Sequence, residues 1–202
     1  MAVRLMVYDA TAGALSRAWR AGAVLYRALG RLDATYGART WEEALAWIAR
    51  HDDIAEVQYW GHGKWGSVLV DRAPLDARSL VPGQAHHAAL ADVRARLAPD
   101  ALVWLRTCEA FGARAGHDFA AALSEFFAPR RARVAGHTYV IGALQSGLHG
   151  LAPGARPDWP LDEGLAEGTP EAPLRAHASS PKAPNTITCF DGAVPDELFA
   201  RA

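Results

Sequence analysis

Two side chains capable of covalent chemistry stand at the ends of apolar segments in this sequence. His62 lies between two glycines, just after the run VQYW at residues 57 to 60, and Cys108 closes the run ALVWLRTC at residues 101 to 108. A thiol needs a neighbouring base or cation to act as a nucleophilic thiolate. Imidazole titrates in the range that suits this task. The two segments therefore raise the hypothesis of a cysteine nucleophile served by a histidine base.

Both segments are predicted to be strands of a mainly parallel sheet. Strand-like runs and helix-like spacing alternate along the chain, with strands at 3–8, 55–60, 101–108 and 132–135 and helices at 14–29, 41–51, 86–97 and 116–127. This alternation predicts an α/β fold with helices on both faces of the sheet. The carboxyl ends of parallel strands share one edge, where ligands bind. If their strands are neighbours, His62 and Cys108 meet at that edge.

Residues 150 to 185 interrupt the alternating pattern. They hold more than half of the 12 prolines and show little periodicity. We interpret them as a Pro/Gly-rich loop insertion within a single domain of residues 1 to 202, because residues 186 to 190 are typical of a final strand. Within the insertion, the acidic segment PDWPLDEGLAEG favours a solvated loop, with a lid or a self-cleavage loop as the alternatives.

Composition excludes several classes of function. Half of the 202 residues are hydrophobic and the formal net charge is −1, so we expect no nucleic-acid partner and no membrane-surface patch. No apolar run has the length of a membrane span, and the first residues lack the features of a signal peptide, so we expect a cytoplasmic setting. Cys108 and Cys189 are the two cysteines, too few for a disulfide framework, and Cys189 is expected to be buried. The oligomeric state stays open.

The glycines beside His62 suggest how a substrate could be held. The backbone N–H of Gly63 is unobstructed by a Cβ and can come close to a substrate carbonyl. Together with the N–H of Cys108 it would form an oxyanion hole, which stabilises the charge that develops during acyl transfer.

The order and spacing of the two segments resemble those of caspase-like cysteine peptidases of clan CD. The stretch YWGHGKWGSVLV is similar to the His-Gly-x-x-Gly segment of bacterial CHAT and DUF4347-type domains, and LRTCEAFGARAGHDFAAAL is similar to their Cys segment. The resemblance covers roughly residues 1 to 142. It implies a three-layer α/β/α sandwich of the caspase-hemoglobinase type. It also implies that Cys108 is the nucleophile and His62 the base, and that a protein or peptide substrate is hydrolysed through an acyl-enzyme without a metal or organic cofactor.

Three further residues are candidates for substrate binding. In the family that the chain resembles, the residue two positions before the nucleophile lines the S1 pocket. Here that residue is Arg106, which would favour an acidic or polar P1 residue unless it pairs with Glu109. Trp65 either walls the cleft or caps the hairpin that follows His62. His137 either lines the cleft or is an ordinary histidine at a strand end.

The sequence also departs from the caspase pattern. Glu109 follows Cys108, where caspases have arginine and glycine, and a carboxylate facing the thiol would oppose thiolate formation. A catalytically idle interaction domain is therefore the main alternative, and an Arg106–Glu109 pair closing the cleft would favour it. A hydrolase or transferase using the same pair is a third possibility. A zinc site of Cys108, His62 and His137 is less favoured, because zinc usually needs further firm ligands.

Overall fold

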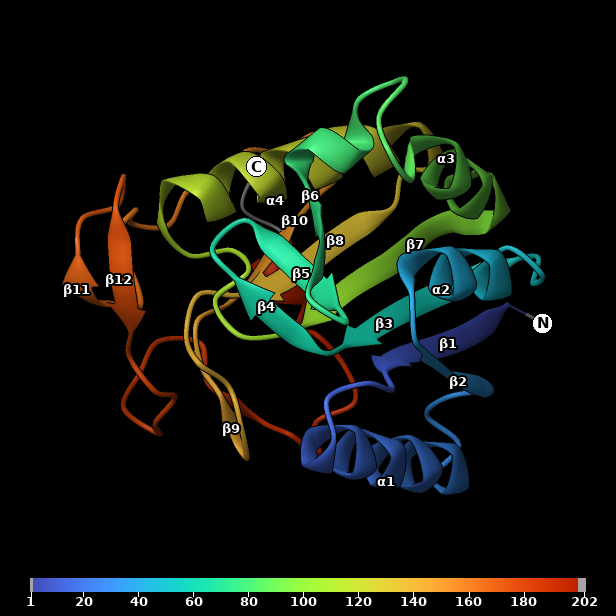
Figure 1. Ribbon diagram of the computed structural model, residues 1–202, viewed down its shortest axis with the longest axis horizontal. Helices are drawn as coiled ribbons and strands as arrows, with labels where there is room; N and C mark the ends of the chain where they lie inside the picture. Colours follow the sequence, from blue (N-terminus) through green and yellow to red (C-terminus); the bar gives the residue numbers. More distant parts are fainter. Residues whose placement is uncertain (1, 200–202) are drawn as a thin grey trace.

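The computed structural model describes residues 2 to 199, which form an α/β fold around a mixed, mostly parallel sheet of six strands (Figure 1). The strand order is β2-β1-β3-β7-β8-β10. The strands are β1 Val3–Asp9, β2 Ala34–Ala38, β3 Ile54–Trp60, β7 Leu97–Arg106, β8 Arg133–His137 and β10 Leu148–Leu151. Only the edge strand β10 pairs antiparallel with its neighbour. The prediction of an α/β fold with a mainly parallel sheet is confirmed.

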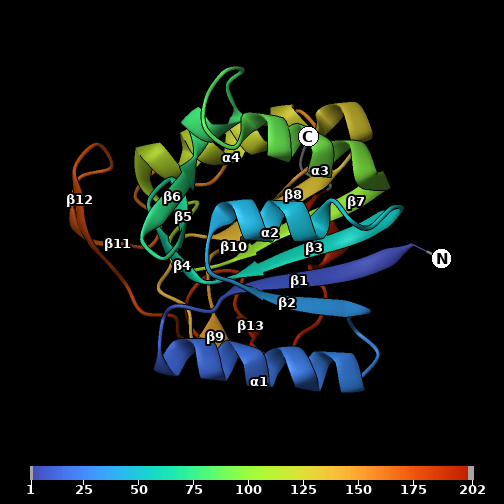
Figure 2. The same cartoon turned by 45° about the vertical axis from the view of Figure 1, so that its right-hand side comes forward.

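Helices lie against both faces of this sheet. In both ribbon views, α1 lies on one side and α2, α3 and α4 lie on the other (Figures 1 and 2). The helices are α1 Ala14–Ala28, α2 Trp41–Ile48, α3 His87–Arg96 and α4 Ala113–Phe127, with short 3-10 helices η1 Ala77–Leu80, η2 Ala128–Arg130 and η3 Asp196–Leu198. Helix α2 begins at a capped turn, because Thr40 Oγ1 accepts a hydrogen bond from the Glu43 N–H at 3.2 Å.

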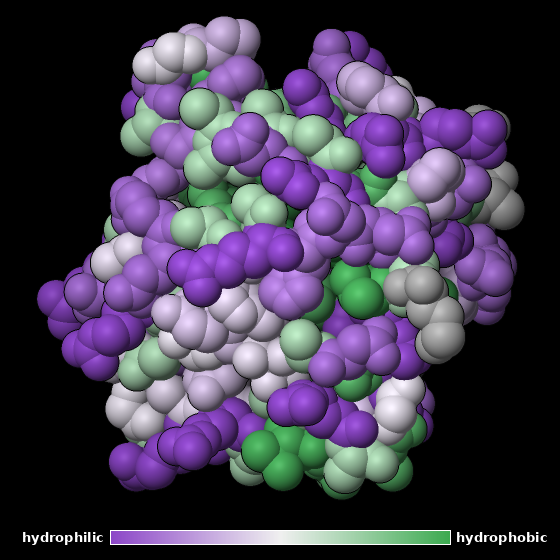
Figure 3. Space-filling model, turned by 90° about the vertical axis from the view of Figure 1, so that its right-hand side faces the viewer, coloured by the Kyte–Doolittle hydropathy of each residue, from purple (hydrophilic) through white to green (hydrophobic). Residues whose placement is uncertain are grey.

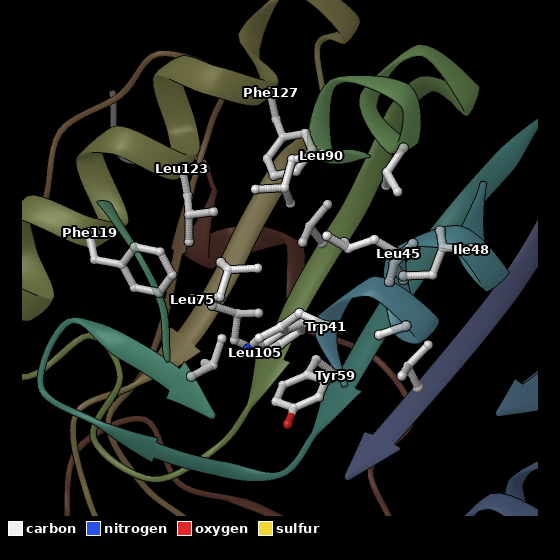
Figure 4. A pocket seen from close by; sticks show the side chains of 16 residues that line it. Trp41, Leu45, Ile48, Tyr59, Leu75, Leu90, Leu105, Phe119, Leu123 and Phe127 are labelled. Carbon is white, nitrogen blue, oxygen red and sulfur yellow. The ribbon is translucent and has the colours of Figure 1, made fainter. Parts of the chain in front are cut away.

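The largest part of the hydrophobic core lies between the sheet and helices α2, α3 and α4. In Figure 4 the side chains of Phe119, Leu123 and Phe127 on α4 point toward those of the sheet and of α2. They enclose an apolar cavity of about 60 Å³. This cavity is a small gap in the packing with no polar group to orient a substrate, so it is not a candidate active site.

A smaller cluster packs α1 onto the opposite face of the sheet. Met6, Tyr26 and Trp60 are its largest members. The α1 backbone comes close to the sheet at Gly22, where an added Cβ would lie 2.9 Å from the Trp60 ring. The contact fixes α1 beside the end of β3, the strand that leads to His62.

Several elements differ from the sequence-based expectations. The strand β2 was not predicted, because its polar and small residues give no apolar run. The hairpin expected after His62 is present as β5 Ser67–Val70 and β6 Ala73–Asp76, and β4 His62–Lys64 joins it in a separate three-stranded sheet that was not predicted. The final strand expected at residues 186 to 190 is only β13 Ile187–Thr188, which pairs with β9 Leu144–Gln145 and not with the six-stranded sheet.

The segment at residues 150 to 185 is not the plain solvated loop that its composition predicts. It contains a hairpin of β11 Leu165–Gly168 and β12 Pro173–Ala176, which stands out at the left edge of Figure 1. It also buries Trp159, whose ring stacks on the ring of His149 at 4.2 Å. Aromatic burial therefore anchors the acidic segment to the domain. Among residues 2 to 199, no helix has the length and apolar character needed to cross a membrane.

Replacing Phe119 with alanine should lower the free energy of unfolding by about 3 to 5 kcal/mol, because its ring is fully buried and adjoins an existing cavity. Urea denaturation followed by tryptophan fluorescence measures the change. The control Leu174→Ala, at a side chain that is 71 % exposed, should stay within about 0.5 kcal/mol of wild type. Equal losses in the two variants would contradict the described core.

Candidate active site

The strands that carry His62 and Cys108 are parallel neighbours. β3 pairs with β7, and Trp60 lies opposite Arg106 at the carboxyl ends of the two strands. His62 and Cys108 each stand two positions beyond this last pair. The condition that the sequence left open, that the two strands adjoin, is therefore met.

The two loops that follow these strands are in direct contact at Gly63. An added Cβ on Gly63 would collide with the carbonyl oxygen of Cys108 and would lie 2.5 Å from Thr107 Oγ1. The N–H of Gly66 donates to the carbonyl of Ala110 at 3.0 Å and ties the loops together a second time. Gly61 is required for a similar reason, because its Cβ would collide with the Tyr59 hydroxyl. The glycines on either side of His62 therefore allow the backbone there to pack closely against Tyr59, Thr107 and Cys108.

Cys108 lies at the start of a sharp turn that β8 supports. The next residue, Glu109, has φ of 42°, in the left-handed region that glutamate rarely adopts. Backbone hydrogen bonds hold this conformation: the Glu109 N–H donates to the Tyr139 carbonyl at 2.9 Å, and the Phe111 N–H donates to the His137 carbonyl at 3.0 Å. Strained backbone that neighbouring structure enforces is common at functional sites.

The environment of the thiol favours its protonated form. Burial raises the pKa of Cys108, and the nearby Glu109 carboxylate raises this pKa further. The Ile141 N–H opposes these effects by donating to Sγ at 3.4 Å, while the thiol faces the Ile141 carbonyl at 3.8 Å. The resting group is therefore a thiol, and a nucleophilic attack needs a base to take its proton.

His62 is exposed at the rim of the same site. Its ring meets the ring of Trp19 edge to face, with centroids 5.6 Å apart and an interplanar angle of 81°. Within residues 2 to 199 the imidazole nitrogens have no hydrogen-bond partner, so no carboxylate orients the ring. The Trp19 ring on α1 contacts the imidazole and orients it instead. Sequence analysis missed this role, because Trp19 stands on a helix far from either motif and carries no local signal.

Cys108 and His62 line one cleft of about 700 Å³. Its walls come from α1, from the ends of β3 and β7, from residues 140 to 145 and from residues 189 and 190. Cys189 also lines this cleft and is only partly buried, so the expectation that it is a buried residue is wrong. Figure 3 shows the opposite side of the molecule, from which the strands begin, and apolar side chains gather there along the lower edge, the side on which α1 lies in Figure 1.

Arg106 lies on this cleft but is fully engaged by the protein. Its side chain is nearly buried and lies over the rings of Trp104 and Trp60, at 4.1 and 4.6 Å. All five N–H groups of the guanidinium have acceptors. Nε and Nη2 both donate to Gln145 Oε1, and Nη2 also donates to the Cys189 carbonyl. Nη1 donates to the Tyr26 hydroxyl and to the Asp191 carbonyl. An ion pair with a substrate carboxylate would require one of these hydrogen bonds to break.

Glu109 does not pair with Arg106. Its Oε1 lies 4.0 Å from Lys64 Nζ instead, and its Oε2 is buried without a partner among the described residues. Burial raises the pKa of Glu109, and Lys64 lowers it. The closed Arg106–Glu109 pair that would have favoured an idle domain is therefore absent from the described residues.

Two predicted substrate contacts lie elsewhere. His137 is fully buried and its Nδ1 lies 3.2 Å from the Ser146 carbonyl; burial lowers its pKa to about 3. Trp65 lies under Lys64, whose Nζ is 4.3 Å from the ring centroid. Neither residue is among those that line the cleft. The alternative of a zinc site made by Cys108, His62 and His137 is not supported, because His137 does not line the cleft with the other two residues. Gly63 contacts the Cys108 backbone but is not among the residues that line the cleft. Its role as an oxyanion donor stays a prediction.

Comparisons with known proteins identify no relative of this chain. It matches no family model, and neither the curated proteins nor the solved structures give a match. The geometry of the cleft is therefore the main guide to function.

Replacing Gly63 with alanine should lower the free energy of unfolding by about 1 to 3 kcal/mol, because the new methyl group overlaps the Cys108 carbonyl oxygen and the Thr107 side chain. Urea denaturation measures the loss. Gly142→Ala is the matched control, since a Cβ there meets no heavy atom within 4 Å, and its stability should stay near that of wild type. A Gly63→Ala protein as stable as wild type would contradict the close approach of the two loops.

Replacing Glu109 with glutamine should lower the pKa of Cys108, because the carboxylate adds to the increase that burial causes. The rate of Cys108 alkylation by iodoacetamide, measured against pH, should then rise at a lower pH than in wild type. Glu125→Gln removes an exposed carboxylate of α4 and should leave the profile unchanged. A profile that does not move in Glu109→Gln would show that this carboxylate does not act on the thiol.

Proposed function

We propose that this protein is a cysteine endopeptidase in which Cys108 attacks a peptide carbonyl and His62 acts as the base. One observation carries the proposal: the thiol and the imidazole end neighbouring parallel strands and line the same cleft of about 700 Å³. The site lies beyond the carboxyl ends of the strands, where α/β folds bind their ligands. The resemblance of both segments to those of caspase-like peptidases supports the same assignment.

The architecture that we propose is the three-layer α/β/α sandwich of the caspase-hemoglobinase type. Its support is the position of α1 on one face of the sheet and of α2, α3 and α4 on the other (Figure 2). A mostly parallel sheet of six strands with one antiparallel edge strand is compatible with it.

The proposed reaction runs through a thioester. His62 takes the thiol proton as Sγ attacks the carbonyl carbon, and the C=O electron pair moves onto oxygen. The tetrahedral intermediate collapses, the C–N bond breaks, and the leaving amine takes the proton from His62. Water then attacks the thioester while His62 accepts its proton, and the C–S bond breaks to restore the thiol and release the acid. The raised pKa of Cys108 favours proton transfer during the attack over a preformed thiolate.

A catalytically idle interaction domain is the second candidate function. The observation that favours it is the engagement of Sγ by the Ile141 backbone, together with the burial and the Glu109 charge that keep the thiol protonated. In that case the cleft would bind a protein segment without cleaving it.

Cleavage of a pool of unstructured peptides, with new termini identified by mass spectrometry, tests the proposal. Wild type should cleave, Cys108→Ala should not, and His62→Ala should be slower by about 10² to 10⁴-fold because it lacks the general base. His87→Ala removes a histidine of α3 outside the cleft and should retain wild-type activity.

Alkylation of Cys108 by iodoacetamide gives a readout that needs no substrate. Its rate should fall in His62→Ala and not in His87→Ala. No cleavage by wild type, together with equal alkylation rates in wild type and His62→Ala across the pH range, would refute the peptidase and support the idle domain.

A further inference from the structure

Large apolar side chains form the walls of the cleft beside Cys108. Helix α1 contributes Leu15 and Leu25, which are 47 % and 39 % exposed. The segments at residues 140 to 145 and 189 to 190 contribute Val140 and Phe190, which are 38 % and 61 % exposed. An apolar patch left in water beside a reactive group is typical of a binding site that a ligand covers.

The cleft offers no fixed charge that is free to pair with an ionic side chain of a substrate. Among the lining residues that the structure describes, none carries a carboxylate. Arg106 carries the one permanent charge, and the protein's own oxygens accept all of its N–H groups. A carboxylate or ammonium group entering the cleft would lose water without gaining a fixed charge free to pair with it, because Arg106 is occupied and His62 serves as the proposed base. This loss is unfavourable.

We propose that this cleft binds a large apolar side chain, of the size of leucine or phenylalanine, on the residue whose carbonyl carbon Cys108 attacks. The inference rests on the proposed peptidase function and gives its substrate class. It replaces the acidic or polar P1 residue that Arg106 suggested. Leu25 is then a specificity-determining residue, because it belongs to the α1 wall of the same cleft that Cys108 and His62 line.

Peptidyl chloromethyl ketones that differ only in the residue next to the reactive group test this inference. The Cys108 sulfur attacks the methylene carbon while its proton passes to His62 or to water, a C–S bond forms, and chloride leaves with the electron pair of the C–Cl bond. Because Cys189 lies in the same cleft, the modified cysteine must be identified by peptide mapping, with Cys108→Ala as the reference. Iodoacetamide, which has no side chain to bind, measures the intrinsic reactivity of the thiol.

Leucine and phenylalanine probes should label Cys108 at least about tenfold faster than aspartate or lysine probes of the same length. Leu25→Arg should reduce the rate with the phenylalanine probe and raise it with the aspartate probe, because it places a free cation on the wall. The matched control is Val24→Arg, which lies next to Leu25 on α1, is 64 % exposed and is outside the cleft lining. It should change neither rate.

Binding of unreactive peptides to Cys108→Ala protein keeps the test independent of the thiol. Peptides with phenylalanine at the central position should bind at least about tenfold more tightly than the same peptides with aspartate or lysine there, as measured by calorimetry. Equal or tighter binding of the aspartate or lysine peptides would overturn the inference.

The two proposals can fail separately. Preferential labelling by aspartate probes, with alkylation that still depends on His62, would overturn the apolar substrate class and leave the peptidase standing. Preferential labelling by apolar probes, with alkylation that is unchanged in His62→Ala, would support the apolar cleft and refute the proposed dyad.

Discussion

The close approach of the loop after β3 to the end of β7 is the constraint on which the site depends. At Gly63 there is no space for a side chain against the Cys108 carbonyl oxygen and the Thr107 side chain, and the Gly66–Ala110 hydrogen bond joins the same two segments. The parallel pairing of β3 with β7 places the loops at one edge, and the glycines allow them to touch. A thiol and an imidazole that are far apart in the chain thereby share one cleft.

The buried cation of Arg106 fixes the walls of that cleft. It draws together the Gln145 side chain, the backbone of residues 189 and 191, and the hydroxyl of Tyr26 on α1. Burial lowers the pKa of this guanidinium, and its neutral oxygen partners and aromatic neighbours compensate in part for the loss of water. The charge therefore organises segments of this chain, and most of the exposed surface of the cleft is apolar.

Residues from the segment at 150 to 185 support the chain around residues 138 to 141, beside the cleft. Glu163 Oε1 accepts a hydrogen bond from the Thr138 hydroxyl at 2.7 Å and lies 2.6 Å from His149 Nε2. Val140 pairs with Ala178, so residues of the predicted insertion support the loop whose Ile141 contacts the Cys108 sulfur. A segment that composition describes as solvated thus positions the cleft wall beside Cys108.

The sequence by itself determined the α/β class and the placement of His62 and Cys108 at strand ends, because apolar runs and helical spacing are local patterns. Tertiary structure alone decided that Arg106 is occupied by the protein's own oxygens and that His137 is buried. Partners such as Gln145 come from distant segments, and no local pattern encodes which of them meet. Strand order and loop packing bring them together, so these assignments depend on long-range contacts that propensity and periodicity do not contain.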